Sequence, residues 1–554
     1  MVLSDTTGSS VDSVRPVPDP ARNTGGSRRG LMLAMGLLVV LWLATLPFLR
    51  FRVFPDAAAY VAIAEHYLAG RFDVAVNAYW SPLVSWLWAL PLGAGVEPAL
   101  ATKIGGLVAG LLTLHGVYRL LRPLPVPSWA ADVTLVALVP FLVLAGSLPT
   151  PDLLMTGLLT VWVARLLDPA FLVDRRFAVV TGVVAGLAAL AKLYALPVVL
   201  TVTVMVLLIA PRHGIERRRA FPSHAIAALG LAVVIGTWGV VISITEGTPT
   251  LGTAASVNLD VASATGGGSP IYRDGLFPPP HPDADSAWED PGALPGRAAE
   301  GSGSGAESPG WSSARAQTVV QNLKLSVRQL LAWAPLLVLA GVAHLWLVVD
   351  RGLETSVRRR VETAALAAAI HLGGLQLVYV QQRYAWFTLV AIVPGTLLGL
   401  WRFGVWRRAR HRDPSRGGPL PGALLAAGVG VLVLTLVGPV LREAPRVAAA
   451  ADLHRDLASD LDGLGLDGAR VASDRAWSDT LLMCFYAGCR SYGQTSPEAH
   501  ADWRTQLERH EVQLYLRWGD QLPDDVQPLQ VQTVVGPIDE RTLYVYRAEQ
   551  LYPG

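Results

Sequence analysis

Asp56 is the residue whose type and position most directly indicate chemistry. It stands in FPDAAAYVAIAEHYLAGRF, shortly after an apolar run at residues 31–49. Aromatic residues follow it, including Tyr79 and Trp80 in NAYWSPLVSWLW. A carboxylate can accept the proton of a reacting hydroxyl group. A carboxylate at a membrane surface, under aromatic cover, is therefore a candidate base for a substrate that a lipid carries.

Other ionisable residues stand at the ends of apolar runs, where charges are costly and are usually paired or functional. They are Asp152 in TPDLLMTGLLTVWVARLL, Lys192 with Tyr194 in GLAALAKLYALP, and Arg383 with Tyr384 in QQRYAWFTLVAIVPG. We expect them to share one level with Asp56 and to form a pocket with it, with Tyr79, Trp80 and His66 as further substrate-binding residues. Each has a simpler interpretation as well. Acids cap helices, cations extend to the interface, Tyr and Trp form aromatic belts, and His66 could lie on a water-facing helix surface.

The composition indicates a chain that crosses a membrane many times. Of the 554 residues, 52% are hydrophobic and 16% are charged, and the mean hydropathy is +0.40. Soluble domains rarely combine these values. A span needs about 17 to 25 apolar residues, and we expect about 11 transmembrane helices. They lie near residues 31–49, 99–121, 131–148, 153–167, 177–190, 196–210, 225–244, 330–349, 364–380, 385–400 and 423–441.

The distribution of arginine predicts the orientation. Cytoplasmic loops carry an excess of Arg and Lys. With the N-terminus in the cytoplasm, every basic cluster falls on the cytoplasmic side of the predicted spans. These clusters contain Arg28, Arg29, Arg119, Arg122, Arg175, Arg176, Arg217, Arg218, Arg219, Arg358, Arg359, Arg360, Arg402, Arg407, Arg408, Arg410 and Arg412. Asp56 and the C-terminal region then lie outside.

The segments outside the spans differ in character. We expect a disordered cytoplasmic tail at residues 1–30, a transmembrane domain at 31–441 with outer loops at 50–98 and 246–326, and an extracytoplasmic domain at 442–554. The second outer loop is rich in Gly, Pro and Ser, which is typical of irregular structure. In the C-terminal domain, ARVASD, VQLYLRWG and TLYVYRA predict strands, and residues 448–460 and 478–486 predict helices, so the domain is a small α/β fold.

Cysteine is nearly absent. Cys484 and Cys489 are the two cysteines of the sequence, so neither a disulfide framework nor a cysteine-rich metal site is expected. Their spacing leaves open whether they form a disulfide with each other.

The motifs together resemble the GT-C superfamily of polytopic membrane glycosyltransferases. The resemblance is carried by PDAAAYVAIAEHYLAGRF, YWSPLVSWLWAL, TPDLLMTGLLTVWVARLL, GLAALAKLYALP and QQRYAWFTLVAIVPG, in this order, over about the first four hundred residues. The chain is most similar to the bacterial protein mannosyltransferases and the lipid A aminoarabinose transferases. The fold class that follows is a mostly α polytopic helix bundle with a small extracytoplasmic α/β domain.

The resemblance also implies an activity. A sugar would pass, with inversion, from a polyprenyl-phosphate donor to a glycan, lipid or protein of the cell envelope, at the outer face of a bacterial cytoplasmic membrane. Asp56 would be the base, Asp152 a second catalytic acid, and Lys192 and Arg383 the phosphate-binding cations. Many relatives have a second acid directly after the first, where this chain has Ala57. We therefore expect no obligatory metal, although a divalent ion is possible. No other cofactor is expected, and the composition gives no reason to expect a nucleic-acid partner.

Two other classes of function remain open at this stage. A secondary transporter also has many spans with buried charges, although transporters usually show repeated halves, and no internal repeat is found here. An envelope-assembly protein could use its outer domain to bind a partner and its spans as anchors.

Overall fold

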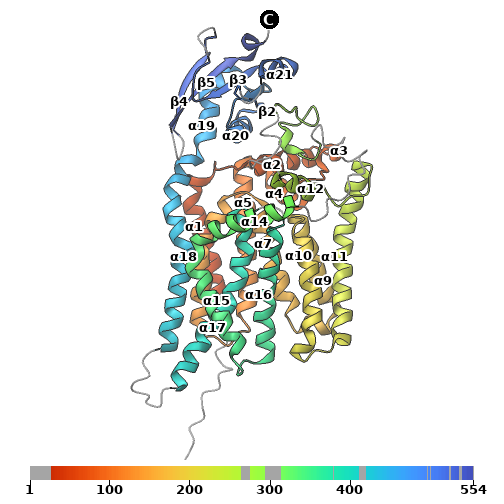
Figure 1. The fold of residues 1–554 in the computed structure, drawn as a ribbon, viewed down its shortest axis with the longest axis vertical. Coiled ribbons are helices and arrows are strands. Elements are labelled where there is room, and N and C mark those ends of the chain that lie inside the picture. Colours follow the sequence, from red (N-terminus) through yellow and green to blue (C-terminus); the bar gives the residue numbers. More distant parts are fainter. Residues whose placement is uncertain are drawn as a thin grey trace, which may run out of the picture.

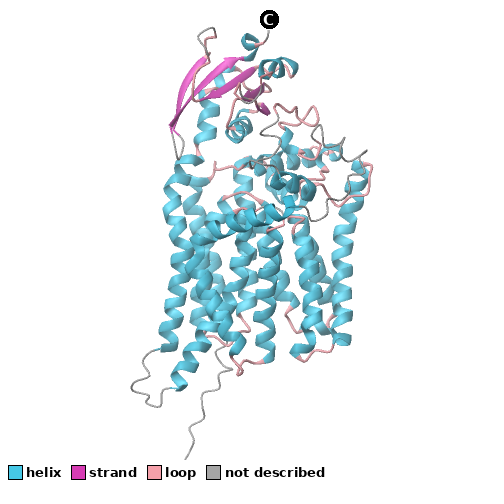
Figure 2. Cartoon of the chain, viewed as in Figure 1, coloured by secondary structure: helices cyan, strands magenta, loops and turns pink. Residues whose placement is uncertain are grey.

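The computed structural model describes residues 26–263, 275–293, 313–377, 380–410, 420–495, 497–498, 501–522, 526–535 and 540–552. A bundle of long helices carries a small β-sheet at one end, and short helices lie between the bundle and the sheet (Figures 1 and 2). Most of the disordered tail expected at the N-terminus lies outside the described residues, as do parts of the Gly/Pro-rich loop.

Six described helices are long and apolar enough to cross a membrane. They are α1 (Arg28–Leu49), α5 (Pro98–Leu121), α6 (Ser128–Ser147), α10 (Ala195–Ile209) continued by η2 (Ala210–His213), α11 (Arg217–Glu246), and η6 (Gln382–Ala385) continued by α17 (Trp386–Arg410). Each coincides with one of the eleven predicted spans.

The five other predicted spans coincide with helices of the same bundle. They are α7 (Pro151–Leu166), α9 (Arg175–Ala191), α15 (Ala334–Val349), α16 (Thr355–Leu375) and α18 (Leu420–Ala451). Over their described residues, these five helices are not both long and apolar enough to count as spans on length and composition alone. The count of eleven therefore stays a prediction.

Local sequence explains where these helices begin and how closely they pack. Proline at the first helical position starts α5 and α7, because its fixed backbone angle suits a helix and its missing N–H is not needed there. Asp174 caps α9 by accepting hydrogen bonds from the backbone N–H groups of Arg176 and Phe177. Gly106 of α5 packs against the backbone of Gly146 of α6 with no room for a Cβ atom, which is the small-residue packing typical of membrane helices.

The short elements at the sheet end of the bundle cover its core. They are α2 (Pro55–Leu68), α3 (Phe72–Ala75), α4 (Pro82–Gly93), α12 (Ala254–Ser263), η4 (Ala287–Glu289), and α14 (Ser313–Leu330) with η5 (Leu331–Trp333). Helix α2 is buried on nearly all sides. It is therefore a packed element of the fold. Its sequence agrees with this, because Pro55 suits the start of a helix and no clear polar face is present.

The C-terminal residues form a five-stranded sheet with the order β2-β1-β3-β5-β4. The strands are β1 (Arg470–Ser473), β2 (Arg490–Gln494), β3 (Leu514–Trp518), β4 (Gln530–Val535) and β5 (Glu540–Arg547). Strand β1 pairs in parallel with β2 and β3, and β5 pairs antiparallel with β3 and β4. The three predicted strands correspond to β1, β3 and β5, whereas β2 and β4 had not been predicted.

Helices pack on the faces of this sheet. They are α19 (Leu453–Asp460), α20 (Trp477–Ala487) and α21 (Trp503–Arg509), with the short η7 (Asp462–Leu464) and η8 (Ala548–Leu551). The expected helices near 448–460 and 478–486 are α19, which continues from the end of α18, and α20. Cys484 of α20 and Cys489 form a disulfide, which answers the question that their spacing had left open.

Residues 275–293, which we call the bridging segment, join the sheet to the short helices. The backbone N–H of Phe277 donates to the carbonyl of Tyr492 in β2 (3.0 Å), and the N–H of Ser491 in β2 donates to the carbonyl of Asp285 (2.7 Å). The same segment packs on α2 through η4. The edge strand β2 is thus partly paired by a loop that lies about two hundred residues earlier in the sequence.

Candidate functional site: a charged row in a cavity at the sheet end

Two helix starts position the two acids. Asp56 directly follows Pro55 at the start of α2, and Asp152 directly follows Pro151 at the start of α7. A carboxylate in the first turn interacts favourably with the positive end of the helix dipole. Both acids are buried, and Asp152 is 0% exposed.

Arg383 and Lys192 link these acids into one row. Arg383 Nη2 lies 2.8 Å from Asp56 Oδ2, and Arg383 Nε lies 3.4 Å from Asp152 Oδ2. Lys192 Nζ donates to Asp152 Oδ1 at 2.6 Å. The order along the row is Asp56, Arg383, Asp152, Lys192, so acid and cation alternate and the four formal charges sum to zero. This arrangement satisfies the requirement that buried charges be paired.

Aromatic rings hold the two cations in place. Lys192 Nζ lies 3.7 Å from the centre of the Tyr384 ring, and the Arg383 guanidinium lies 4.6 Å from the centre of the Phe54 ring. Both distances allow cation–π attraction, which is stronger where water is excluded. Tyr194 lies close by, and its hydroxyl donates to the carbonyl of His371 in α16 at 2.5 Å.

The row forms part of the wall of a cavity of about 810 Å³. Seven of the nine predicted site residues line this cavity: Asp56, Tyr79, Trp80, Lys192, Tyr194, Arg383 and Tyr384. Asp152 is held just behind the wall by its two cations. The structure therefore brings eight predicted residues to one place, although it does not test the role of any of them.

Arg383 has donors to spare in this wall. Its Nη1 is buried and makes no hydrogen bond, and its Nε faces Asp152 at 3.4 Å without a full hydrogen bond. A buried polar group without a partner costs free energy, so an anion bound in the cavity would relieve that cost. Guanidinium groups suit phosphate because their planar donors match the phosphate oxygens.

Four aromatic residues line the cavity and had not been predicted as site residues: Phe54, Tyr60, Trp288 and Trp477. The rings of Tyr60 and Trp80 lie 5.0 Å apart, those of Trp80 and Trp288 5.4 Å, and those of Trp288 and Trp477 5.6 Å. Burial, and then the carboxylates of Asp56 and Asp152, hold the pKa of Tyr60 well above its usual range. Tyr60 lies one helical turn after Asp56, a signal that could have identified it; Trp477 carried no local signal.

A second cavity, of about 790 Å³, lies on another side of α2 and borders α11. Apolar and aromatic side chains such as Phe72, Trp86 and Val233 line it, and no charged residue does. It offers room for acyl chains and no group that could transfer a proton. We therefore place the chemistry at the charged row.

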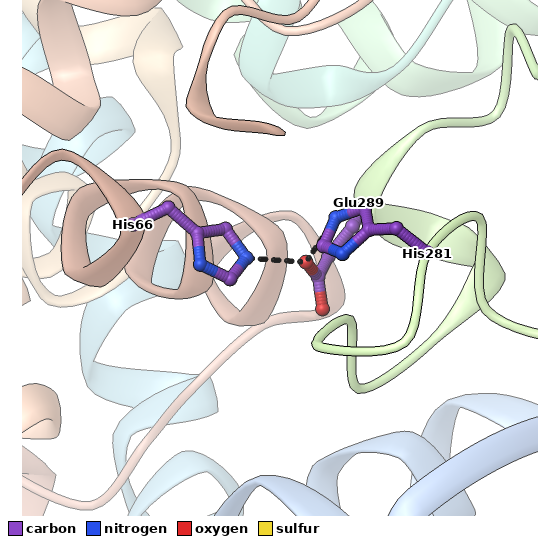
Figure 3. Close-up of side chains that lie close together, drawn as sticks. All are labelled: His66, His281 and Glu289. Carbon is purple, nitrogen blue, oxygen red and sulfur yellow. Dashed lines mark hydrogen bonds and ion pairs between the residues drawn. The ribbon is translucent and has the colours of Figure 1, made fainter. Parts of the chain in front are cut away.

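His66 does not line the charged cavity. It is buried on α2, so the water-facing interpretation is wrong, and its Nε2 lies 3.3 Å from Glu289 Oε2 of the bridging segment. His281 completes this group (Figure 3). Among the described residues, this is the single cluster of three or more His, Cys, Asp or Glu side chains with the spacing of a metal site. Nothing about its Pro-rich surroundings had indicated that His281 and Glu289 would meet His66.

Comparisons with known proteins bear on the fold. No protein-family model and no curated protein sequence matches the chain. Among solved structures, ArnT from Cupriavidus metallidurans bound to undecaprenyl phosphate aligns with a TM-score of 0.55 at 14% identity, over 95% of this chain and 100% of ArnT. ArnT in the apo state gives 0.51 at 13% identity, over 93% and 99% of the two chains.

A third solved structure is the mycobacterial arabinofuranosyltransferase AftD, with a TM-score of 0.49 at 14% identity, over 95% of this chain and 40% of AftD. The likeness to ArnT extends over the bundle and the C-terminal sheet together, because it covers nearly all of both chains. The chain therefore has the fold of the GT-C membrane glycosyltransferases, as its motifs had predicted.

Proposed function

We propose that this protein is an inverting glycosyltransferase that moves a sugar from a polyprenyl-phosphate donor to an acceptor in the cell envelope. The observation that carries the proposal is the row of Asp56, Arg383, Asp152 and Lys192 in the wall of a cavity at the sheet end of the bundle. A GT-C fold shared with ArnT, whose solved structure holds undecaprenyl phosphate, supports it.

In this proposal the donor phosphate binds Lys192 and the spare donors of Arg383. Apolar residues of the lining include Leu196 of α10, Ile370 of α16 and Leu377, two residues after the end of α16. Leu377 is 52% exposed, so this side of the cavity opens outward over an apolar surface. A polyprenyl tail would leave the cavity there, while the sugar lies under Tyr79, Trp80 and Trp288.

The chemical step is one displacement at the anomeric carbon. The acceptor oxygen forms a bond to that carbon from the face opposite the phosphate, the carbon–oxygen bond to the phosphate breaks, and polyprenyl phosphate leaves with the electron pair. The proton of the acceptor hydroxyl moves to the Asp56 carboxylate, which acts as general base. The two cations stabilise the charge that develops on the phosphate. Asp152 holds both cations in place, and no step requires a metal.

The proposed location is a bacterial cytoplasmic membrane with the sheet end outside. At the opposite end of the bundle, Arg119 pairs with Asp168 at 2.9 Å, and the charge of Arg360 acts on both. Arginine gathers at that end, as expected for a cytoplasmic face. The acceptor, whether glycan, lipid or protein, would approach Asp56 from the water beside the C-terminal sheet.

The proposal is tested by transfer of labelled sugar from a panel of polyprenyl-phosphate sugars in membranes that contain the protein. We expect Asp56→Asn to lower the transfer rate about 10²- to 10⁴-fold, the usual contribution of a general base. Asp73→Asn is the matched control, because Asp73 is an exposed acid on α3 at the same end and does not line the cavity.

Equal transfer by the wild type and Asp56→Asn would remove Asp56 as the base. If no donor of the panel supports transfer and vesicles that contain the protein take up solute, the protein is a transporter and not a glycosyltransferase.

A further inference from the structure

The cluster of His66, His281 and Glu289 lies apart from the charged row, and no step of the proposed reaction uses it. His66 and Glu289 are buried and His281 is partly buried, with its side chain 19% exposed. The three come from two segments, because His66 belongs to α2 and the other two belong to the bridging segment (Figure 3).

The distances suit a shared cation. Glu289 Oε2 lies 3.3 Å from His66 Nε2 and 4.0 Å from His281 Nε2, and the three ligand atoms lie within 4.8 Å of one another. Zinc binds imidazole nitrogen and carboxylate oxygen at about 2.0–2.2 Å, so neighbouring ligand atoms in a tetrahedral site stand about 3.3 Å apart. A rotation of the partly exposed His281 ring would bring its nitrogen to that separation.

Neither ring nitrogen of His281 makes a hydrogen bond to Glu289 or to another described partner that would satisfy it. Its Nδ1 is buried without a partner, and its Nε2 is too far from Glu289 for a hydrogen bond. The Glu289 carboxylate, in contrast, is held in one orientation, because its Oε1 accepts a hydrogen bond from the backbone N–H of Asp285 at 2.6 Å. Two further carboxyl side chains, those of Glu65 and Asp285, lie close enough to Glu289 to interact with it. Two imidazoles and an oriented carboxylate are a ligand set that suits zinc better than magnesium or calcium.

We propose that His66, His281 and Glu289 bind a zinc ion that fastens the bridging segment onto α2. The segment is already held there by backbone contacts, since Asn77 Nδ2 donates to the Glu289 carbonyl (2.6 Å) and Trp80 Nε1 donates to the Trp288 carbonyl (2.9 Å). The ion adds a second attachment through the side chains of His281 and Glu289. Trp288, which directly precedes Glu289, is thereby held over the cavity. Water completes the coordination through the exposed side of His281.

The test is zinc binding by the full chain, purified without a histidine tag in lipid nanodiscs and stripped with a chelator. The probe is Zn²⁺ alone, measured by elemental analysis and by competition with a chromogenic chelator. We expect one zinc per wild-type chain, and at least about tenfold weaker binding by His281→Ala and Glu289→Gln, since even groups that only support a ligand affect affinity by 10- to 100-fold. His510→Ala is the control, because His510 caps the end of α21, outside the cluster; this variant should bind zinc as the wild type does.

Cobalt gives a second measurement that does not depend on how well a variant folds. Co²⁺ in the wild-type site should show the visible absorption of a four-coordinate ion, and Zn²⁺ should bleach it. Zinc should also raise the unfolding temperature of the wild type and of Asp56→Asn, which separates this proposal from the proposed activity. Wild-type protein that binds no more zinc than His281→Ala, and that shows no cobalt absorption, would leave the cluster as a histidine–carboxylate pair and overturn the proposal.

Discussion

At the scale of single residues, Arg383 is the link between the two acids of the cavity. Its guanidinium reaches Asp56 and Asp152 at the same time, and each acid belongs to a different helix. Lysine carries the same charge but has a single compact donor group, so it cannot replace a planar guanidinium that spans two carboxylates. The identity of this residue matters as much as its charge.

We therefore predict that Arg383→Lys lowers sugar transfer more than its conserved charge suggests. A lysine would pair with one acid and leave the other short of a partner, and an uncompensated buried charge costs about 3–5 kcal/mol. Initial rates over a range of donor concentrations should show a rise in KM for the donor together with a fall in kcat. The conservative change Lys192→Arg, which keeps a cation on Asp152, should lose less; equal losses in both variants would contradict the bridging role.

At the scale of elements, the helices approach one another through glycine. Gly106 of α5 meets the backbone of Gly146 in α6, whereas Gly36 of α1 has open space where a Cβ would stand. The two positions provide a matched pair of substitutions. They separate the effect of helix propensity from the effect of packing.

We predict that Gly106→Ala destabilises the protein and that Gly36→Ala does not. At Gly106 the added methyl group forces α5 and α6 apart, and overpacking costs about 1–3 kcal/mol. At Gly36 alanine favours the helix by about 0.5–1 kcal/mol. Thermal unfolding in detergent, followed by the fluorescence of buried tryptophans, should show the midpoint fall for the first variant and stay or rise for the second. Equal midpoints would mean that the two helices do not pack as closely as described.

The same scale explains what the sequence could and could not predict. Asp56, Asp152, Lys192 and Arg383 were found because each is an ionisable residue at the end of an apolar run, and helices of similar length bring such ends to one level. Strands β1, β3 and β5 were found from their buried apolar residues. Strand β2 contains Gly493 and is paired partly by the bridging segment, so its own pattern is weak. Trp477 reaches the cavity, and His281 and Glu289 reach His66, through contacts across long stretches of sequence, which no local pattern encodes.

At the scale of the whole molecule, the C-terminal sheet region rests on the bundle through a few specific contacts. The Tyr486 hydroxyl of α20 donates to the carbonyl of Phe51 at 2.6 Å, just before α2. Tyr552, in contrast, donates to the carbonyl of Val512 at 2.7 Å, within the sheet region itself. One hydroxyl therefore connects two parts of the molecule, and the other holds one part together.

We predict that Tyr486→Phe loosens the contact between these parts, because it leaves the Phe51 carbonyl without its partner, at a cost of about 1–3 kcal/mol. Hydrogen exchange should become faster at residues 50–54 in this variant. Tyr552→Phe should speed exchange near residues 510–514 and leave 50–54 unchanged. The same pattern in both variants would show that the contact to Phe51 does not hold the sheet region in place.

The electrical neutrality of the cavity wall governs how a turnover would end. A donor phosphodiester brings one negative charge into a neutral chamber, and the proposed transfer leaves the enclosed total unchanged, because the acceptor's proton remains on Asp56 while the carrier gains a charge. While Asp56 holds the proton, the wall carries one net positive charge that attracts the spent carrier, and escape of the proton to water removes that attraction. Release of the carrier then requires loss of the proton from Asp56. The rate of multiple turnovers should therefore fall more in deuterium oxide than the rate of a single turnover does.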